Sequence, residues 1–184
     1  IYDFTIGGPA HASMYPYGVG VDSEGYIYVA DAFNHRVLKY NSTGSLVLNW
    51  GGLGNGPGKF RKPHGLVVDS DGFVYVADTG NHRVQKFDSN GNFILQWGSY
   101  GSGPGQFVHN LGIAVSRDLS VGRYTGPSYV YVSDRPNHRV QKFYSNGTLI
   151  LQWGPEPGPG SLSDPRGIAV DAVGNVYVVD MDLN

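Results

Sequence analysis

The sequence contains no cysteine among its 184 residues. Disulfides, thiolate metal sites and cysteine nucleophiles are therefore excluded. Long hydrophobic runs are also missing, and no apolar stretch approaches the roughly 20 residues that a membrane-spanning helix needs. An excess of charge is absent too, because 13 Lys and Arg residues stand against 15 Asp and Glu residues, for a net charge of −2. This balance gives no global attraction to nucleic acid or to an anionic membrane.

Glycine, proline and aromatic residues are abundant instead. The 28 glycines and 11 prolines make up about a fifth of the chain, and aromatic residues account for 13%. That glycine and proline content lies below the range typical of disordered low-complexity sequence. The composition predicts a compact, turn-rich, all-β protein.

One eleven-residue word occurs three times, as ADAFNHRVLKY at 30–40, ADTGNHRVQKF at 77–87 and SDRPNHRVQKF at 133–143. Its Asn-His-Arg-Val core begins at Asn34, Asn81 and Asn137, in steps of 47 and 56 residues. A fourth copy begins at Asp180 but lacks the His-Arg-Val. A period in the forties with many β-branched and aromatic residues is typical of a β-propeller or another repeat array.

Each repeat divides into four strand-like runs separated by turns. Asp-Gly and Asn-Gly turns between β-rich runs are the strongest short-range signal of a hairpin. Four antiparallel strands joined by short turns make one blade of a propeller. In the second copy the expected strands are 65–69, 73–78, 83–87 and 93–97.

The repeated word, the Lys-Phe or Lys-Tyr that ends it, the Asp-Gly hairpin and the Gly-Pro-Gly-x-Phe linkers at 54–60 and 101–107 resemble NHL repeats. The resemblance covers nearly the whole chain. It implies an all-β fold, a β-propeller of four-stranded antiparallel blades, usually six in number. The chain would then hold three complete blades plus partial blades at both ends, as part of a six-bladed ring.

The repeats divide the chain into five parts. Residues 1–13 are expected to hold the end of a preceding blade and a linker, with 2–6 as its fourth strand. The others are repeat 1 at 14–60, repeat 2 at 61–107, repeat 3 at 108–162 and a truncated repeat 4 at 163–184. The longer third step places an inserted loop at 117–128, at the opposite end of the propeller from the turns of the repeated word. We expect open edges at both ends of such an arrangement, covered by further blades or by self-association.

Each copy of the word groups an Asp, an Asn, a His and an Arg, a set that would also suit acid–base or phosphate chemistry. Catalytic machinery is normally assembled once, whereas this set recurs, so we interpret it as architecture. We expect the Asp to accept hydrogen bonds from turn amides, the Asn to tolerate a left-handed turn conformation, and the Arg to form a bidentate pair with a carboxylate. The residues are Asp31, Asn34, His35, Arg36, Asp78, Asn81, His82, Arg83, Asp134, Asn137, His138 and Arg139.

Ligand-binding residues are sought where the copies differ. The residue before each first-strand glycine varies, as do the two residues after the repeated Asp. In an up-and-down blade these positions lie at the same end, so they converge on one mouth of the axial channel. Their aromatic, basic and imidazole mixture suits a ligand-binding face, with neutral surface variation as the alternative. The candidates are Tyr17, Phe33, His64, Arg135 and Arg166.

No metal, cofactor or catalytic residue is predicted. Asp22, Asp69 and Asp171 end first strands and could form a ring of cation ligands, but Ser116 breaks the set and capping of the turns explains them more simply. Two N-glycosylation sequons begin at Asn41 and Asn146, both in turns between third and fourth strands. About one sequon is expected by chance, so the two tilt the prediction only slightly toward an extracellular or cell-surface protein.

Three functions compete on these grounds. The first is a non-catalytic binding or scaffold propeller that engages a protein, peptide or glycan through the variable mouth. The second, implied by the resemblance, is part of a six-bladed enzyme, a metal-assisted lyase or hydrolase whose catalytic residues lie partly outside this segment. RNA binding, known for some NHL propellers with a strongly basic face, is disfavoured by the even charge balance. We predict the first, without a membrane or nucleic-acid partner.

Overall fold

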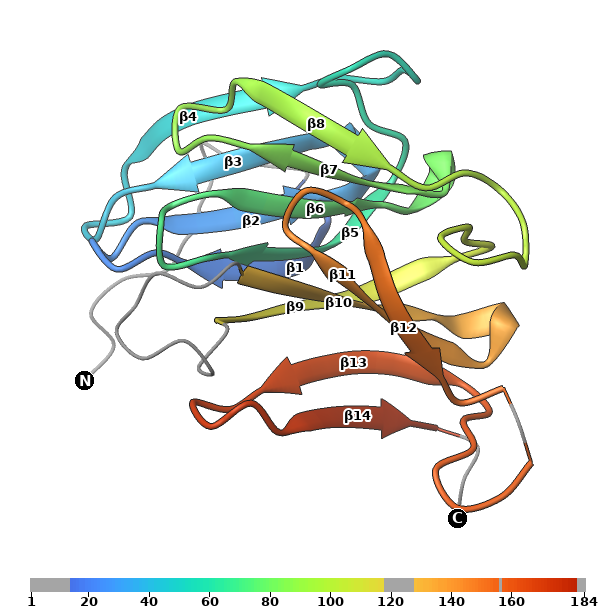
Figure 1. Cartoon of the computed structure of the whole chain (residues 1–184). Coiled ribbons are helices and arrows are strands. Elements are labelled where there is room, and N and C mark those ends of the chain that lie inside the picture. The colour runs from blue at the N-terminus through green and yellow to red at the C-terminus, as the bar shows by residue number, and fades with distance from the viewer. Residues whose placement is uncertain (1–13, 118–127, 156, 182–184) are drawn as a thin grey trace.

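The computed structural model describes residues 14–117, 128–155 and 157–181. Within these residues the chain forms three four-stranded antiparallel sheets and one two-stranded sheet (Figure 1). In each sheet the strands follow one another in chain order, as an up-and-down blade requires. The all-β propeller expected from the sequence is confirmed.

The strand bounds repeat from blade to blade. Blade one contains β1 (Pro16–Val21), β2 (Ile27–Asp31), β3 (Arg36–Tyr40) and β4 (Leu46–Gly51). Blade two contains β5 (Pro63–Val68), β6 (Val74–Asp78), β7 (Arg83–Phe87) and β8 (Phe93–Trp97). Blade three contains β9 (Asn110–Arg117), β10 (Ser128–Asp134), β11 (Arg139–Tyr144) and β12 (Leu149–Trp153), and the last pair is β13 (Pro165–Val170) and β14 (Val176–Asp180). Second and third strands are joined by short 3-10 helices, η2 (Ala32–Asn34), η3 (Thr79–Asn81) and η4 (Arg135–Asn137).

The first strands of successive blades, β1, β5, β9 and β13, lie side by side (Figure 1). In blades one and two and in the last strand pair, the hairpin turn between first and second strands is capped by the aspartate that follows the first strand. In blade two, Asp69 Oδ1 accepts hydrogen bonds from the backbone N–H groups of Asp71 (3.0 Å) and Phe73 (2.9 Å), and Oδ2 accepts one from the Tyr75 hydroxyl (2.9 Å). Asp22 and Asp171 make the same contacts in their turns. These aspartates are thus engaged in closing turns, as the sequence analysis suggested.

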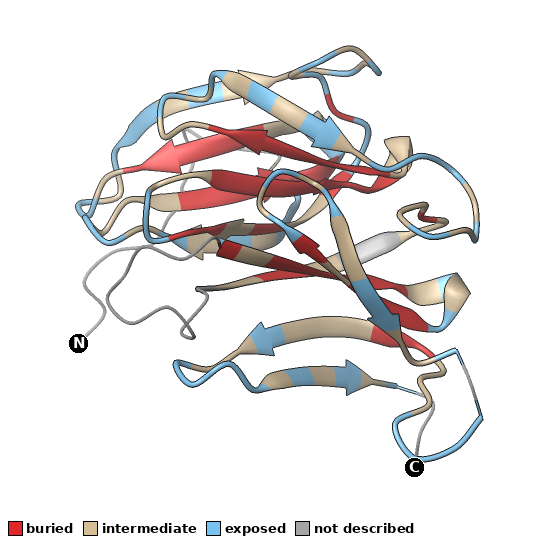
Figure 2. Cartoon of the chain, in the orientation of Figure 1, coloured by how far each residue is buried: buried red, intermediate tan, exposed pale blue. Residues whose placement is uncertain are grey.

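The core lies between blades rather than within one sheet, because both faces of the middle strands are apolar. Figure 2 shows that buried residues concentrate on the second and third strands of the three full blades, β2, β3, β6, β7, β10 and β11. Between blades one and two, Trp50 of β4 packs against Phe87, with ring centroids 5.8 Å apart. Trp97 packs against Phe143 in the same way between blades two and three, at 5.7 Å. Each tryptophan therefore joins its own blade to the next.

Several expectations concern parts of the chain outside the described residues. The fourth strand expected at 2–6 lies there, as does most of the loop at 117–128. Arg117 and Ser128, which flank that loop, are paired at the hairpin end of blade three, opposite η4. No helix in the described part of the chain is long and apolar enough to span a membrane.

Candidate functional site

The aspartate of the repeated word is the centre of a buried hydrogen-bond network. Asp78 is fully buried, and its Oδ1 accepts a hydrogen bond from the backbone N–H of Arg61 in the preceding linker (2.7 Å). Its Oδ2 accepts three more, from Asn81 Nδ2 (2.9 Å), Arg83 Nε (2.8 Å) and Gln85 Nε2 (2.9 Å). The aspartate thus ties the linker that precedes a blade to the second and third strands of that blade. The backbone N–H that donates to Asp78 therefore belongs to this linker, whereas the sequence predicted donors from a turn.

The arginine of the word binds backbone carbonyls, which corrects the expectation of a bidentate pair with a carboxylate. Arg83 Nε donates to Asp78 Oδ2 at 2.8 Å. Its Nη1 donates to the Asn55 carbonyl (2.8 Å), and its Nη2 donates to the carbonyls of Gly56 (2.9 Å) and Lys59 (2.8 Å). Arg139 binds the equivalent linker carbonyls in blade three. The guanidinium therefore holds the Gly-Pro-Gly linker against its blade.

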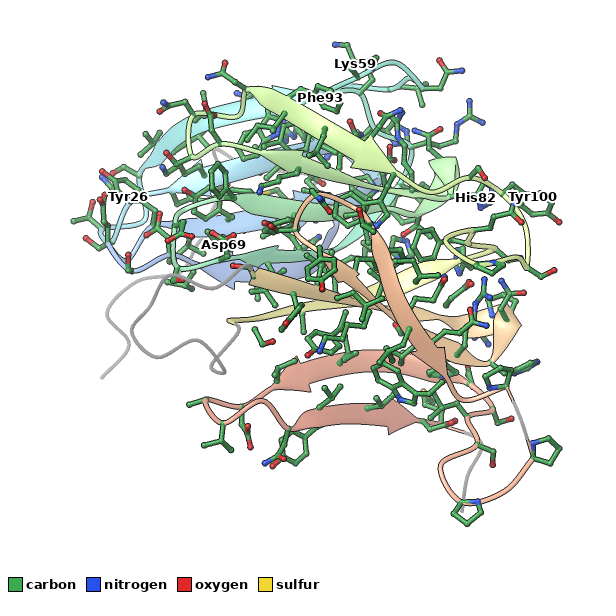
Figure 3. All side chains as sticks on the ribbon, viewed as in Figure 1. Tyr26, Lys59, Asp69, His82, Phe93 and Tyr100 are labelled. Carbon is green, nitrogen blue, oxygen red and sulfur yellow. The ribbon has the colours of Figure 1, made fainter. Side chains whose placement is uncertain are left out.

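The left-handed residue of the word is the histidine, so the assignment of that conformation to Asn was wrong. His35, His82 and His138 have φ of 56°, 56° and 52° and follow the 3-10 helices directly. Each imidazole contacts the next linker, as His82 Nδ1 does at 2.7 Å from the Val108 carbonyl. Figure 3 shows His82 beside Tyr100, at the end of the molecule away from Asp69. Since each member of the word has a partner in the scaffold, we infer that the word is structural.

The variable positions surround one cavity of about 480 Å³ at the starts of the first strands. Four of the five predicted ligand-binding residues line it: Tyr17, His64, Arg135 and Arg166. The fifth, Phe33, does not line the cavity, but its ring centroid lies 6.1 Å from that of Tyr17. The convergence expected from strand order is therefore present in the geometry. We refer to this cavity as the mouth.

One side of the mouth is aromatic. The rings of Tyr17 and His64 are stacked, with centroids 4.4 Å apart and planes inclined by 19°. His64 in turn meets His109 edge to face, with centroids 5.7 Å apart. These contacts make a continuous row of rings from blade one, through blade two, to the linker that begins blade three.

The other side of the mouth is cationic and is organised by one carboxylate. Asp164, which is buried, accepts a hydrogen bond from Arg135 Nε on Oδ1. Its Oδ2 accepts two from Arg166, from Nε (3.0 Å) and Nη2 (2.9 Å). The hydrogen bonds from Arg166, reinforced by Arg135, lower the pKa of the Asp164 carboxyl. Asp164 therefore stays ionised and fixes two guanidiniums from neighbouring blades.

Between the two sides lie two neutral imidazoles. Burial, with the nearby His109 and Lys62, lowers the pKa of His64 to about 4. Burial and the positive charge of Arg135 also lower the pKa of His109. Neither His64 nor His109 has a hydrogen-bond partner for its ring nitrogens within the described residues. Each imidazole can therefore offer one donor and one acceptor to a ligand at neutral pH.

The pKa of His64 predicts a pH-dependent stability. Because this pKa is about 4 in the folded chain and about 6.5 unfolded, the unfolded state binds more protons between these values, and stability falls as pH falls through that window. After allowance for partial exposure, we expect the loss to be about 1–2 kcal/mol. Urea unfolding from pH 7 to pH 4 should show a shallower loss for His64→Gln than for the wild type. Parallel pH profiles of the two proteins would contradict this prediction.

Two members of the mouth were not predicted from the sequence. His109 lies two residues before Leu111, the position that alignment on the first-strand glycine selects, and directly before Asn110, the first residue of β9. The sequence feature that could have identified His109 is that this histidine lies outside the repeated word. Asp164 was not predicted because nothing in the sequence "SDPRG" indicates that its carboxylate contacts an arginine of the preceding blade.

A second cavity, of about 300 Å³, lies at the opposite end of the first strands. Its polar lining includes Asp69 and Asp171, whose carboxylates are already occupied by their turns. Across the ranges that the structure describes, no three His, Cys, Asp or Glu residues are arranged to hold a metal ion. The cavity therefore offers less recognition chemistry than the mouth.

The two sequons lie in surface turns between third and fourth strands. Asn41 Oδ1 accepts hydrogen bonds from the Thr43 backbone N–H (3.1 Å) and hydroxyl (2.8 Å). Asn146 Oδ1 accepts one from the Thr148 backbone N–H (3.0 Å). Use of these sites for glycosylation stays a prediction.

Comparisons with known proteins agree with this architecture. The NHL repeat family model matches residues 60–87, and the Beta-propeller repeat model matches residues 6–30. Among solved structures, a catalytically inactive virginiamycin B lyase from Staphylococcus aureus is 16% identical, with a TM-score of 0.65 over 91% of this chain and 49% of that chain. An auxiliary nutrient binding protein from Bacteroides ovatus is 15% identical, with a TM-score of 0.66 over 89% of this chain and 45% of that one. A search of curated proteins found no match.

At these identities the solved structures establish the fold alone, and the chain spans about half their length. The strands form up-and-down blades, and the contacts of the Asn-His-Arg word hold linker to blade in blades two and three. The chain is therefore a β-propeller whose second blade contains a matched NHL repeat, at residues 60–87.

Proposed function

We propose that the chain is part of a non-catalytic binding propeller that engages a protein, peptide or glycan at the mouth. One observation carries the proposal: the residues that vary between repeats gather around one cavity, while the invariant word is engaged in the scaffold. The volume of the mouth lies in the range of small-ligand pockets, and its ring faces and free polar atoms are what such pockets use. The likeness to nutrient-binding propellers supports a binding role. We extend the proposal to an extracellular or cell-surface location, which rests on the two sequons.

A binding screen with the full-length protein tests the proposal. Immobilised peptides and oligosaccharides identify a ligand, and its affinity is then measured for Tyr17→Ala and for the control Val173→Ser. Val173 is 74% exposed in the β13–β14 turn, at the other end of the first strands. We expect Tyr17→Ala to weaken binding about tenfold or more, since burying one aromatic contact contributes over 1 kcal/mol, and Val173→Ser to leave it unchanged. The opposite pattern, or no ligand in either library, would reject the mouth as a binding site.

The enzyme alternative rests on the likeness to the virginiamycin B lyase fold. A metal-assisted lyase or hydrolase would need ligands from beyond the residues described. Metal analysis of the purified full-length protein distinguishes the two functions, because a binding propeller requires no stoichiometric metal.

A further inference from the structure

The mouth has an aromatic side and a cationic side, and this difference restricts the kind of ligand that fits it. We infer, resting on the binding function proposed above, that it takes an acidic sugar whose ring lies on Tyr17 and whose carboxylate lies between Arg135 and Arg166.

The guanidiniums retain unused donors. Arg135 gives Asp164 only its Nε, and Arg166 gives it Nε and Nη2. Within the described part of the chain, both terminal nitrogens of Arg135 and Nη1 of Arg166 have no partner. The two side chains are 43% and 42% exposed. Such donors match the two oxygens of a carboxylate with charge-assisted hydrogen bonds.

The local charge favours a single carboxylate. Among the residues that line the mouth, the two guanidiniums, balanced by the neighbouring Asp164 carboxylate, leave one net positive charge, and the imidazoles of His64 and His109 add none at neutral pH because burial lowers their pKa values. Lys62 lies outside this lining, with its ammonium 5.4 Å from the ring centroid of Phe33. A carboxylate carries one negative charge, whereas a phosphate monoester carries nearly two. Since the positive charge of the lining lies on one side, a ligand with one acidic group at one end fits best.

The opposite side presents a flat, partly exposed ring. Tyr17 remains 57% exposed although His64 stacks on it. The negative faces of aromatic rings attract polarised C–H groups, and the C–H face of a sugar ring supplies them. Between this ring and the guanidiniums, the unpartnered nitrogens of His64 and His109 can donate to and accept from hydroxyl groups. Hydroxyl groups along the whole length of a ligand are characteristic of a sugar.

The backbone at the mouth disfavours an added peptide strand. Peptides often bind by pairing with an exposed strand edge. Here the first strands of neighbouring blades approach through glycines, and a Cβ atom on Gly18 would overlap the carbonyl oxygen of His64. The same holds between Gly112 and the Arg166 carbonyl. The strands thus leave no slot between them in which a peptide could hydrogen-bond.

Calorimetric titration of the full-length protein tests the inference. The probes are a tetrasaccharide of three neutral sugars with one terminal uronic acid and the same tetrasaccharide with that single carboxylate methyl-esterified. We expect the acid to bind at least tenfold more tightly than the ester, since hydrogen bonds to a charged group are stronger than neutral ones. Arg135→Gln and Arg166→Gln should each weaken acid binding at least tenfold and leave ester binding unchanged. The control Arg61→Gln removes the same charge from an exposed linker residue outside the cavity lining and should change neither affinity.

Three outcomes would overturn the inference. Equal affinity for acid and ester, with both weakened by Tyr17→Ala, would reject the acidic group while the binding function stands. Binding of a peptide at the mouth without binding of either sugar would reject the sugar in the same way. If Arg61→Gln and Arg135→Gln weaken binding of the acid equally, the arginines would act only through long-range attraction between opposite charges. Circular dichroism of each variant confirms that it is folded.

Discussion

Replacing Arg83 by methionine should lower the free energy of unfolding by about 3–5 kcal/mol, the cost typical of removing one partner from a buried ion pair. The side chain of Arg83 is only 6% exposed, and Asp78 is fully buried. Without the guanidinium, Asp78 would remain as a buried charge, and the linker carbonyls of Asn55, Gly56 and Lys59 would each lose one donor. Methionine fills similar volume, so the loss reports on hydrogen bonds and charge more than on packing.

Repeat 1 supplies a matched control for this prediction. Arg36 occupies the same place in the word and bonds Asp31 through Nε at 2.9 Å, but its side chain is 38% exposed. Because its guanidinium is more exposed than that of Arg83, Arg36→Met should cost only about 1–2 kcal/mol. Both variants are compared with the wild type by urea denaturation. Equal losses for the two variants would show that burial of the guanidinium contributes little, and unchanged stability of Arg83→Met would remove the structural interpretation of the word.

The blades could be predicted from the sequence because repetition fixes their boundaries. The expected third and fourth strands of blade two, 83–87 and 93–97, coincide with β7 and β8. The second strand was expected at 73–78 and begins one residue later, at Val74. The first strand was expected at 65–69, but β5 runs from Pro63 to Val68. The largest difference therefore lies where a linker becomes a strand. A linker has no periodic pattern of its own that would locate this point.

The contacts inside the repeated word could be predicted only in part. Recurrence argued for a structural role of the word, but it could not say which residue bonds which. Asn81 was expected in the left-handed position because asparagine tolerates it. In the structure its amide is committed to Asp78, and the residue after the 3-10 helix, His82, takes that conformation. The targets of Arg83 lie 24 to 28 residues earlier in the chain, and local sequence gives no indication of them.

The position of the mouth followed from strand order, whereas its chemistry depended on contacts between blades. Tyr17 and His64 occupy equivalent positions in neighbouring blades, so their proximity could be expected. The sharing of Asp164 by Arg135 and Arg166 joins the turn of one blade to the first strand of the next. Such a contact depends on the angle between sheets, which the repeat pattern does not specify.

The angle between neighbouring sheets depends on glycines where their first strands contact each other, and Gly18→Ala tests this dependence directly. We expect the substitution to lower the free energy of unfolding by about 2–4 kcal/mol, in the range of overpacking a tight contact. A Cβ atom at this position would overlap the His64 carbonyl oxygen and lie 2.8 Å from the Leu66 backbone nitrogen. These are backbone atoms of β5, which cannot move aside as the end of a flexible side chain could. Relief therefore requires β1 and β5 to separate.

Separation of these strands should also disturb the mouth, since Tyr17 and His64 flank the contact and stack at 4.4 Å. Near-ultraviolet circular dichroism of Gly18→Ala should show a changed tyrosine signal at temperatures where the far-ultraviolet spectrum is still native. Gly56→Ala is the control, because a Cβ atom on Gly56 meets nothing within 4 Å, and its stability should stay within about 0.5 kcal/mol of the wild type. If Gly18→Ala is as stable as Gly56→Ala, the blades adjust to an added methyl group without cost. Close glycine contact would then not set the angle that brings the arginines and the aromatic rings around one cavity.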